Sequence, residues 1–83
     1  MKTPEGYTIV DTTDEDVIYW KHESRDVDIR IKKDGEDYDL DVIIHGKVEP
    51  VGFYDNPSNA KTEAKAIMEE NPEAENIEQQ TAF

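Results

Sequence analysis

The densest group of residues that could do chemistry is a run of alternating carboxylates, Asp37, Asp39 and Asp41. Aspartates at every second position imitate the start of an EF-hand loop, whose oxygen ligands suit calcium. Such a loop also needs glycine at its sixth position and glutamate at its twelfth. Those positions hold Val42 and Val48 here. We therefore predict no metal site, and the sequence offers no other convergent set of metal ligands.

The same aspartates also fit a different hypothesis, because carboxylates on one face of a β-strand recur about every 6.8 Å. Such a row could imitate a nucleic-acid backbone and block a basic cleft. The competing interpretation is the solvent-facing side of an amphipathic strand. The register that we predict for this hairpin sets Lys32 across from Asp37 and Arg30 across from Asp39, and leaves only Asp41 uncompensated. It favours the solvent-facing interpretation.

Catalysis lacks its usual residues in this chain. There is no cysteine, and the two histidines, His22 and His45, fall in different predicted hairpins, so neither thiolate chemistry nor a Ser–His pair is indicated. The glycines are never clustered as a phosphate-binding loop requires. We predict no catalytic residues, no cofactor and no enzyme. An enzyme fragment completed by a partner subunit is a third hypothesis, and it requires the two histidines to lie close together.

Charge limits the class of partner. The 83 residues include 21 Asp and Glu against nine Lys and Arg, a formal net charge of −12. Direct binding of nucleic acid is not expected, because that affinity comes largely from basic residues that neutralise phosphates. The apolar runs are short, so we expect no membrane contact, no signal peptide and a cytoplasmic location. Adaptation to a salty cytoplasm, a basic partner and plain solubility each explain the charge.

The elements that position these residues are mostly strands. Eight Ile and six Val against one Leu favour a pleated sheet. The clearest element is a hairpin over residues 26–44, where apolar and charged residues alternate on both sides of Asp34-Gly35. This dipeptide is a strong signal for a two-residue turn. Placing Lys33 opposite Glu36 sets the register of the hairpin.

Two further strand pairs flank this hairpin. Residues 7–12 and 17–22 form the first, around a polar loop. Residues 48–54 form the last strand, and Pro50 indicates that it lies at a sheet edge because proline cannot donate to the ladder. Simple alternation along this strand places Phe53 on the inward side.

A single helix follows the strands. Asn56 is a suitable N-cap and Pro57 a suitable first helical residue. Pro72 disfavours helical geometry at the preceding residue, so the helix is expected to end near Glu70. One apolar stripe runs along it, formed by Ala60, Ala64, Ile67 and Met68. This stripe is the side that should pack on the sheet.

Together these elements predict an α+β fold, an antiparallel β-meander of about five strands with one C-terminal α-helix packed on one face. Residues 1–71 form this single domain. Residues 72–83 lack basic side chains and are predicted to be an acidic, mobile C-terminal tail, with a short extra strand near Ile77.

Several segments recur in a familiar order over about residues 6–72: Gly6–Thr13, Val17-Ile18-Tyr19, Asp34-Gly35, Phe53-Tyr54-Asp55 and Met68–Pro72. In this order they resemble small uncharacterised acidic proteins of halophilic archaea. The resemblance implies a cytoplasmic protein adapted to high salt, and it implies no activity.

The first strand pair offers a candidate partner-binding site. With Thr12 opposite Val17, one face of the pair carries Trp20 and the other carries Val10, Val17 and Tyr19. Only one face can meet the core of a two-layer domain, and the Trp20 side has more area to bury. Val10, Val17 and Tyr19 would then form an apolar patch in a charged surface, unless the N-terminus or the tail folds over it.

These observations favour a non-catalytic, small acidic binding or accessory domain, adapted to salt and acting through protein–protein contacts with a partner or a second copy. The alternative is an acidic inhibitor or nucleic-acid mimic that blocks a basic surface of another protein. For that role the least neutralised surface is the end of the helix and the tail, with Glu69, Glu70, Glu73, Glu75 and Glu78.

Overall fold

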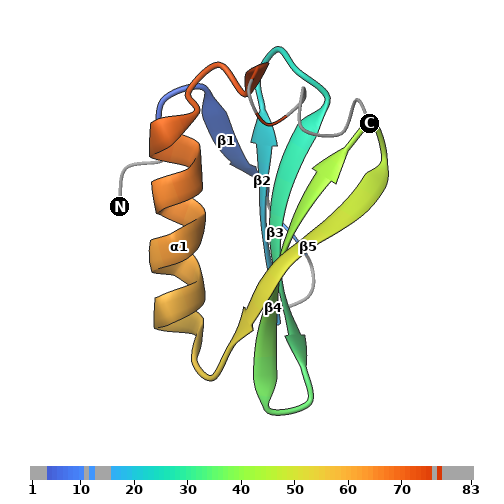
Figure 1. Ribbon diagram of the computed structural model, residues 1–83, viewed down its shortest axis with the longest axis vertical. Helices are drawn as coiled ribbons and strands as arrows, with labels where there is room; N and C mark the ends of the chain where they lie inside the picture. Colours follow the sequence, from blue (N-terminus) through green and yellow to red (C-terminus); the bar gives the residue numbers. More distant parts are fainter. Residues whose placement is uncertain (1–3, 11, 13–15, 76, 78–83) are drawn as a thin grey trace.

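The computed structural model describes residues 4–10, 12, 16–75 and 77 (Figure 1). Five antiparallel strands pair in chain order to form one sheet, and one helix follows them. The predicted α+β meander with a C-terminal helix is confirmed. The elements are β1 Tyr7–Val10, β2 Val17–His22, β3 Val27–Asp34, β4 Asp37–Ile44, β5 Lys47–Tyr54 and α1 Pro57–Glu70.

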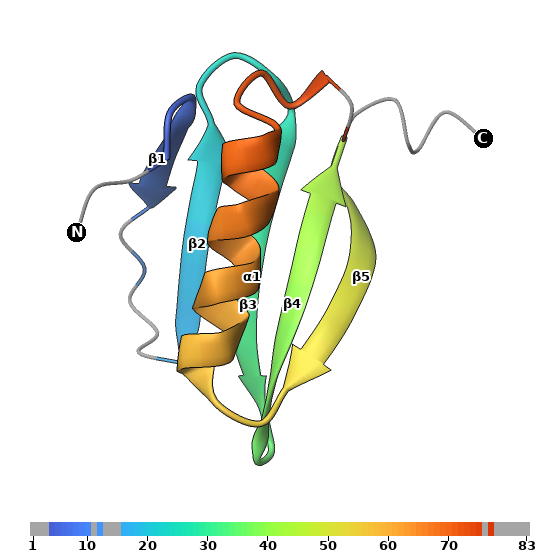
Figure 2. The same ribbon diagram turned by 60° about the vertical axis from the view of Figure 1, so that its left-hand side comes forward.

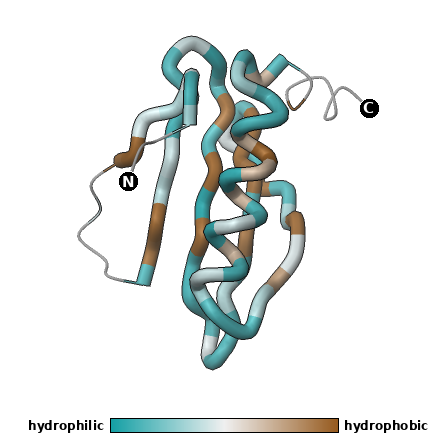
Figure 3. The backbone as a smooth tube through the Cα atoms, turned by 90° about the vertical axis from the view of Figure 1, so that its left-hand side faces the viewer, coloured by the Kyte–Doolittle hydropathy of each residue, from teal (hydrophilic) through white to brown (hydrophobic). Residues whose placement is uncertain are grey.

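Helix α1 lies across one face of the sheet, and the hydrophobic core fills the space between them (Figure 2). Alternate residues of β3 (Val27, Ile29 and Ile31) point toward the helix and are at most 1% exposed. Figure 3 shows apolar stretches of the strands running beside the helix. The side of the sheet that meets α1 is called the covered face below.

The helix begins and ends where the sequence predicts. The Asn56 side chain accepts a hydrogen bond from the Asn59 backbone N–H at 2.8 Å, and Pro57 is the first helical residue. Ala60, Ala64 and Met68 are fully buried, and Ile67 packs at the edge of the core. No described helix is long and apolar enough to cross a membrane.

The β3–β4 hairpin turns one residue later than predicted. Asp34 pairs with Asp37, so the two-residue loop is Gly35-Glu36 rather than Asp34-Gly35. Gly35 has φ +65° and Glu36 has no positive φ, which is the pattern of a type II′ turn with glycine first. The pairing therefore shifts by two residues, which keeps every side chain on its predicted face but changes its partner across the strands.

Strand β5 contains an irregularity that corrects a second prediction. The β4–β5 register shifts between Leu40 and Asp41, so that Asp41 pairs with Pro50 while Leu40 pairs with Gly52. This β-bulge adds one residue to β5, and one extra residue reverses which face the later side chains occupy. Phe53 consequently pairs with Asp39 on the side away from the helix and is 74% exposed, whereas it was predicted to point inward.

The core continues beyond the predicted domain boundary at residue 71. Ala74 is fully buried and Ile77 is 5% exposed within the core cluster. Ile77 has helical backbone rather than the predicted extra strand. Residues 78–83 lie outside the described residues, as does most of the polar loop predicted between β1 and β2.

Two side chains at the β1–β2 edge hold the segment after α1. The Tyr7 hydroxyl donates to the Asn71 carbonyl at 2.9 Å, and His22 Nε2 lies 2.8 Å from the Pro72 carbonyl. Their rings meet edge to face, with centroids 4.9 Å apart. This contact explains why the chain stays on the covered face after the helix ends.

Candidate protein-binding face of the sheet

The side of the sheet opposite α1 is the candidate functional surface. All five strands belong to the sheet and α1 contacts only its covered face, so no helix or strand among the described residues lies over this side (Figure 2). We call it the open face. From strand pairing and alternation it consists of Thr8, Val10, Val17, Tyr19, Lys21, Asp28, Arg30, Lys32, Asp34, Asp37, Asp39, Asp41, Ile43, Val48, Pro50 and Phe53.

The open face is ordered as three rows that cross the strands. The first row runs Val17, Lys32, Asp39 and Phe53 from β2 to β5. The middle row runs Val10, Tyr19, Arg30, Asp41 and Pro50 from β1 to β5. The last row runs Thr8, Lys21, Asp28, Ile43 and Val48. In the first two rows apolar residues lie on the outer strands and charged residues in the centre. In the last row the central β4 position holds Ile43, which is 9% exposed, and beyond the first row Asp34 pairs with Asp37 at the hairpin end.

The structure brings the three predicted partner-binding residues together on this face. Val10 pairs directly with Tyr19, and Val17 precedes Tyr19 by two positions on β2. Val10 is 38% exposed, while Val17 and Tyr19 are half-buried. Trp20 points the other way and is buried in the core, as predicted. Their partner-binding role stays a prediction.

Tyr19 is the most constrained of the three. Its hydroxyl donates to the Asp28 carboxylate on β3 at 2.5 Å. Burial raises the pKa of Tyr19 to about 12, and the hydrogen bond and the negative charge of Asp28 act in the same direction. The ring is thus fixed in place with its hydroxyl occupied, and it offers mainly its apolar surface to a partner.

The centre of the open face is a block of charges that compensate one another. Arg30 and Asp41 form an ion pair at 2.8 Å, and Asp41 is buried. Lys32 lies across from Asp39. Desolvation raises the pKa of Asp39, and the neighbouring carboxylates of Asp34 and Asp41 add to this effect.

This pairing corrects the predicted one, in which Asp41 was the uncompensated carboxylate. In the structure the uncompensated carboxylate is instead that of Asp37, which pairs with Asp34 near the hairpin tip. The open face carries three basic and five acidic side chains, a formal net charge of −2, and the excess corresponds to the Asp34–Asp37 pair at the hairpin end. The basic side chains are Lys21, Arg30 and Lys32, and the acidic ones are Asp28, Asp34, Asp37, Asp39 and Asp41.

The most exposed apolar residue of the face was missed by the sequence analysis. Phe53 forms a second apolar column on β5 with Pro50 and with Val48, which is 45% exposed. The available signal was Pro50 followed by Gly52, because proline and glycine inside a strand are typical of a bulge. With a bulge at that point, alternation alone would have placed Phe53 outward.

The two histidines have separate partners in the structure. His22 Nδ1 accepts backbone N–H groups from Ser24 and Arg25 at 3.2 and 3.0 Å, while Nε2 meets the Pro72 carbonyl. His45 lies in the β4–β5 turn, 3.7 Å from the Asp26 carboxylate. In the described part of the chain no group of three or more His, Asp or Glu residues could hold a metal ion.

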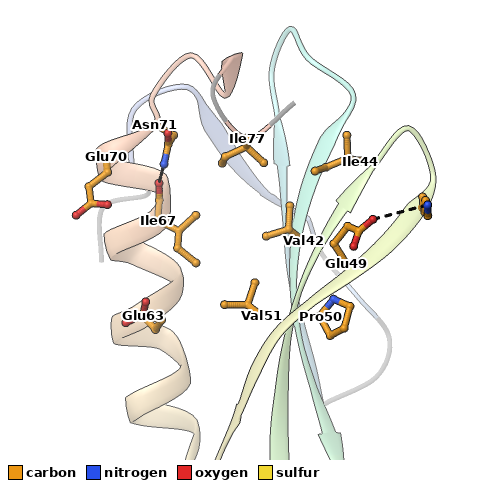
Figure 4. Close-up of a pocket in the computed structure, with 11 residues that line it drawn as sticks. Val42, Ile44, Glu49, Pro50, Val51, Glu63, Ile67, Glu70, Asn71 and Ile77 are labelled. Atoms are coloured by element: carbon orange, nitrogen blue, oxygen red, sulfur yellow. Dashed lines mark hydrogen bonds and ion pairs between the residues drawn. The ribbon is translucent and has the colours of Figure 1, made fainter. Parts of the chain in front are cut away.

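A cavity of about 590 Å³ lies on the other side of the sheet, between α1 and the bulged strand β5. Val51 and Ile67 extend toward one another across it from β5 and α1 (Figure 4). Its rim includes Glu63 and Glu70, and the lysine that lines it, Lys47, lies 3.9 Å from Glu49. The cavity lies beside the bulge, since Val51, the extra residue of β5, lines it.

Comparisons of the chain with protein-family models, with curated proteins and with solved structures found no match. The function therefore has to be argued from the geometry and chemistry of the open face.

Proposed function

We propose that this chain is a non-catalytic binding domain that acts through protein–protein contacts made by the open face. The observation that carries the proposal is the composition of this face. Exposed apolar residues on β1 and β5, above all Phe53, flank a central block of charges in which Arg30 pairs with Asp41 and Lys32 lies across from Asp39. Isolated exposed apolar residues are ordinary, but apolar columns on one unpartnered sheet face are typical of contact surfaces.

Electrostatics supports the same surface. The whole chain carries −12, and the open face accounts for only −2 of it, which corresponds to Asp34 and Asp37 at the hairpin end. The remaining −10 lies elsewhere on the chain, where it attracts basic groups and repels acidic ones. A partner that approaches the open face away from the hairpin end meets compensated charges and apolar side chains, so contact there depends on shape and desolvation.

The proposed setting follows from the same charge distribution. We place the protein in the cytoplasm of a cell with high internal salt, where screening relieves the repulsion among its carboxylates. The proposed partner is a protein or a second copy, rather than nucleic acid or a membrane, because the open face has no excess of basic groups to neutralise phosphates.

The proposal is tested by affinity capture from the source cells at their native salt concentration, with wild type, Phe53→Ser and Val51→Ser as baits. Val51 is a matched control, since it lies on the same strand, is 44% exposed and lines the cavity on the helix side. We expect a bound protein that is retained by wild type and Val51→Ser and lost with Phe53→Ser. Loss with Val51→Ser alone would contradict the proposal.

A second candidate function is supported by the end of the helix. The last turn of α1 contains Glu69 and Glu70 and no basic residue, although the helix dipole disfavours negative charge there. Exposed Glu73 and Glu75 follow. Such a surface suits a basic partner, as an acidic inhibitor would need. Its binding should weaken steeply as salt is raised, whereas contacts through the open face should hold or strengthen.

A further inference from the structure

The cavity between α1 and β5 has aliphatic walls that come from three parts of the chain. Val42 and Ile44 of β4 form its inner wall and are 7% and 3% exposed. Val51 of β5 and Ile67 of α1 extend toward one another across it (Figure 4). Ile77 adds a side chain from the segment after the helix and is 5% exposed. A body placed between Val51 and Ile67 would therefore contact aliphatic side chains on several sides.

The size of the cavity suits a small molecule. Its volume of about 590 Å³ falls inside the range of about 300–1,000 Å³ that is typical of small-molecule sites. Val51 is 44% exposed although it lies on the helix side of the sheet. A ligand in the cavity would remove this apolar surface from water, which favours binding of an aliphatic group.

Charge at the cavity selects the sign of a ligand. The described residues that line it include three carboxylates and one ammonium group, those of Glu49, Glu63, Glu70 and Lys47. The Lys47 ammonium lies 3.9 Å from the Glu49 carboxylate, so it is partly compensated already. The formal balance of −2 attracts a cation and repels an anion.

Glu63 is the carboxylate best placed to meet a cationic group. Desolvation raises the pKa of Tyr54 on β5, and the negative charge of Glu63 adds to this effect. The charge of Glu63 therefore acts on the β5 side of the cavity as well as on its own helix. Among the described residues, no basic side chain forms an ion pair with Glu63.

We infer that this cavity binds a small organic cation with an aliphatic body and a primary ammonium group. The aliphatic body lies between Val51 and Ile67, and the ammonium group lies beside the carboxylate of Glu63. This site is on the opposite side of the sheet from Phe53. The inference therefore goes beyond the proposed function, and either one can fail without the other.

The test is a titration of the full chain with hexylammonium, hexanol and hexanoate, followed by the NMR signals of the Val51 and Ile67 methyl groups. The three probes share one aliphatic body and differ only in the head group. At about 1 M KCl the Debye length is roughly 3 Å, so general attraction to the acidic chain is screened and close contacts remain. We expect saturable shifts, with hexylammonium bound most tightly and hexanoate least.

Two variants separate the body from the head group. Val51→Phe fills the space beside Ile67 and should weaken the binding of hexylammonium and hexanol about tenfold or more. Glu63→Gln should weaken hexylammonium about twofold to fivefold, the size expected for an exposed ion pair, and leave hexanol unchanged. Glu36→Gln at the hairpin tip is the matched control, because it removes the same charge away from the cavity. Circular dichroism melts of each variant confirm that it is folded.

Four results would overturn the inference. They are hexanoate binding as tightly as hexylammonium, equal losses for Glu63→Gln and Glu36→Gln, wild-type binding by Val51→Phe, and shifts at Phe53 and Val48 without shifts at Val51 and Ile67. A variant that ends at Ile77 should bind hexylammonium as wild type does. Tighter binding by that variant would show that residues 78–83 compete for the cavity, which would also overturn the inference.

Discussion

At the scale of single residues, Gly6 and Gly35 both have positive φ, but for different reasons. Gly35 has φ +65°, and a Cβ added there would meet nothing within 4 Å. Gly6 has φ +88°, and a Cβ there would lie 2.1 Å from the Pro72 carbonyl oxygen. Gly35 therefore serves the turn alone. Gly6 also allows the segment after α1 to approach the β1–β2 edge.

This difference predicts two sizes of effect. Gly35→Ala should lower the free energy of unfolding by about 1–2 kcal/mol through backbone strain. Gly6→Ala adds an overpacking cost of about 1–3 kcal/mol, because backbone atoms of Pro72 must move. Urea unfolding of both variants measures the comparison. Equal losses for the two would show that the contact between Gly6 and Pro72 is not part of the folded state.

Two tyrosines make stability dependent on alkaline pH. Burial raises the pKa of Tyr7 to about 12, and burial with the Asp28 hydrogen bond raises that of Tyr19 to about 12, against about 10 for a free tyrosine. The folded state holds these protons more tightly, so the stability is fully present below about pH 10 and is lost as the pH rises toward 12.

This prediction is tested by comparing the phenolate absorbance of wild type with that of single Tyr→Phe variants as the pH is raised. Subtracting the titration of Tyr7→Phe or Tyr19→Phe from that of wild type isolates one hydroxyl in each case. We expect each difference curve to be centred near pH 12. A difference curve for Tyr19 centred near pH 10 would mean that its hydroxyl is free in solution, contrary to the bond with Asp28.

At the scale of elements, alternation and capping residues were enough to predict the strands and the helix, but not how the strands are offset. Both Asp34-Gly35 and Gly35-Glu36 close a two-residue loop, and the choice depends on the turn type, which local sequence does not determine. The resulting shift of two residues does not change the face of the sheet on which each side chain lies. The bulge at Pro50 shifts by one residue, and so it moved Phe53 from the expected core to the open face.

The end of the domain was harder to predict for another reason. Ala74 and Ile77 lie in an acidic stretch without apolar periodicity, and their burial depends on long-range contacts made by Tyr7 and His22 with the carbonyls of residues 71 and 72. Of the candidate site, Val10, Val17 and Tyr19 could be placed on one face from β-strand alternation. The β5 side of that face could not.

The helix start gives a prediction at this scale. Asn56→Ala removes the side-chain oxygen that accepts the Asn59 N–H and should cost about 1 kcal/mol of unfolding free energy. Asn59→Ala is the control, because its side chain is exposed and its backbone N–H remains. Denaturant titrations of both variants decide the point. Indistinguishable midpoints would contradict the assignment of Asn56 as the cap.

At the scale of the whole molecule, most of the charge lies outside the contact surface. The open face carries −2, while residues outside it carry −10. Carboxylates gather at the hairpin tip, with Asp34, Glu36 and Asp37, and around the end of α1. Repulsion among these carboxylates destabilises the folded state. None of these carboxylates contributes to the hydrophobic core.

Salt should therefore stabilise the fold. Raising KCl from about 0.1 M to about 1 M shortens the Debye length from roughly 10 Å to 3 Å, and the melting temperature should rise with it. Lys61→Glu, which adds negative charge on α1, should steepen the salt dependence. A melting temperature that is unchanged or lower at high salt would remove both the repulsion argument and the proposed adaptation to a salty cytoplasm.

The central claim is that a protein covers the open face in the cell. The most direct measurement is photo-crosslinking in the source cells, with a photoreactive phenylalanine analogue at position 53 and, in a separate strain, at position 51. We predict a heavier protein adduct from position 53, which mass spectrometry can assign to a second copy or to another protein, and little from position 51. An adduct from position 51 without one from position 53 would contradict the account.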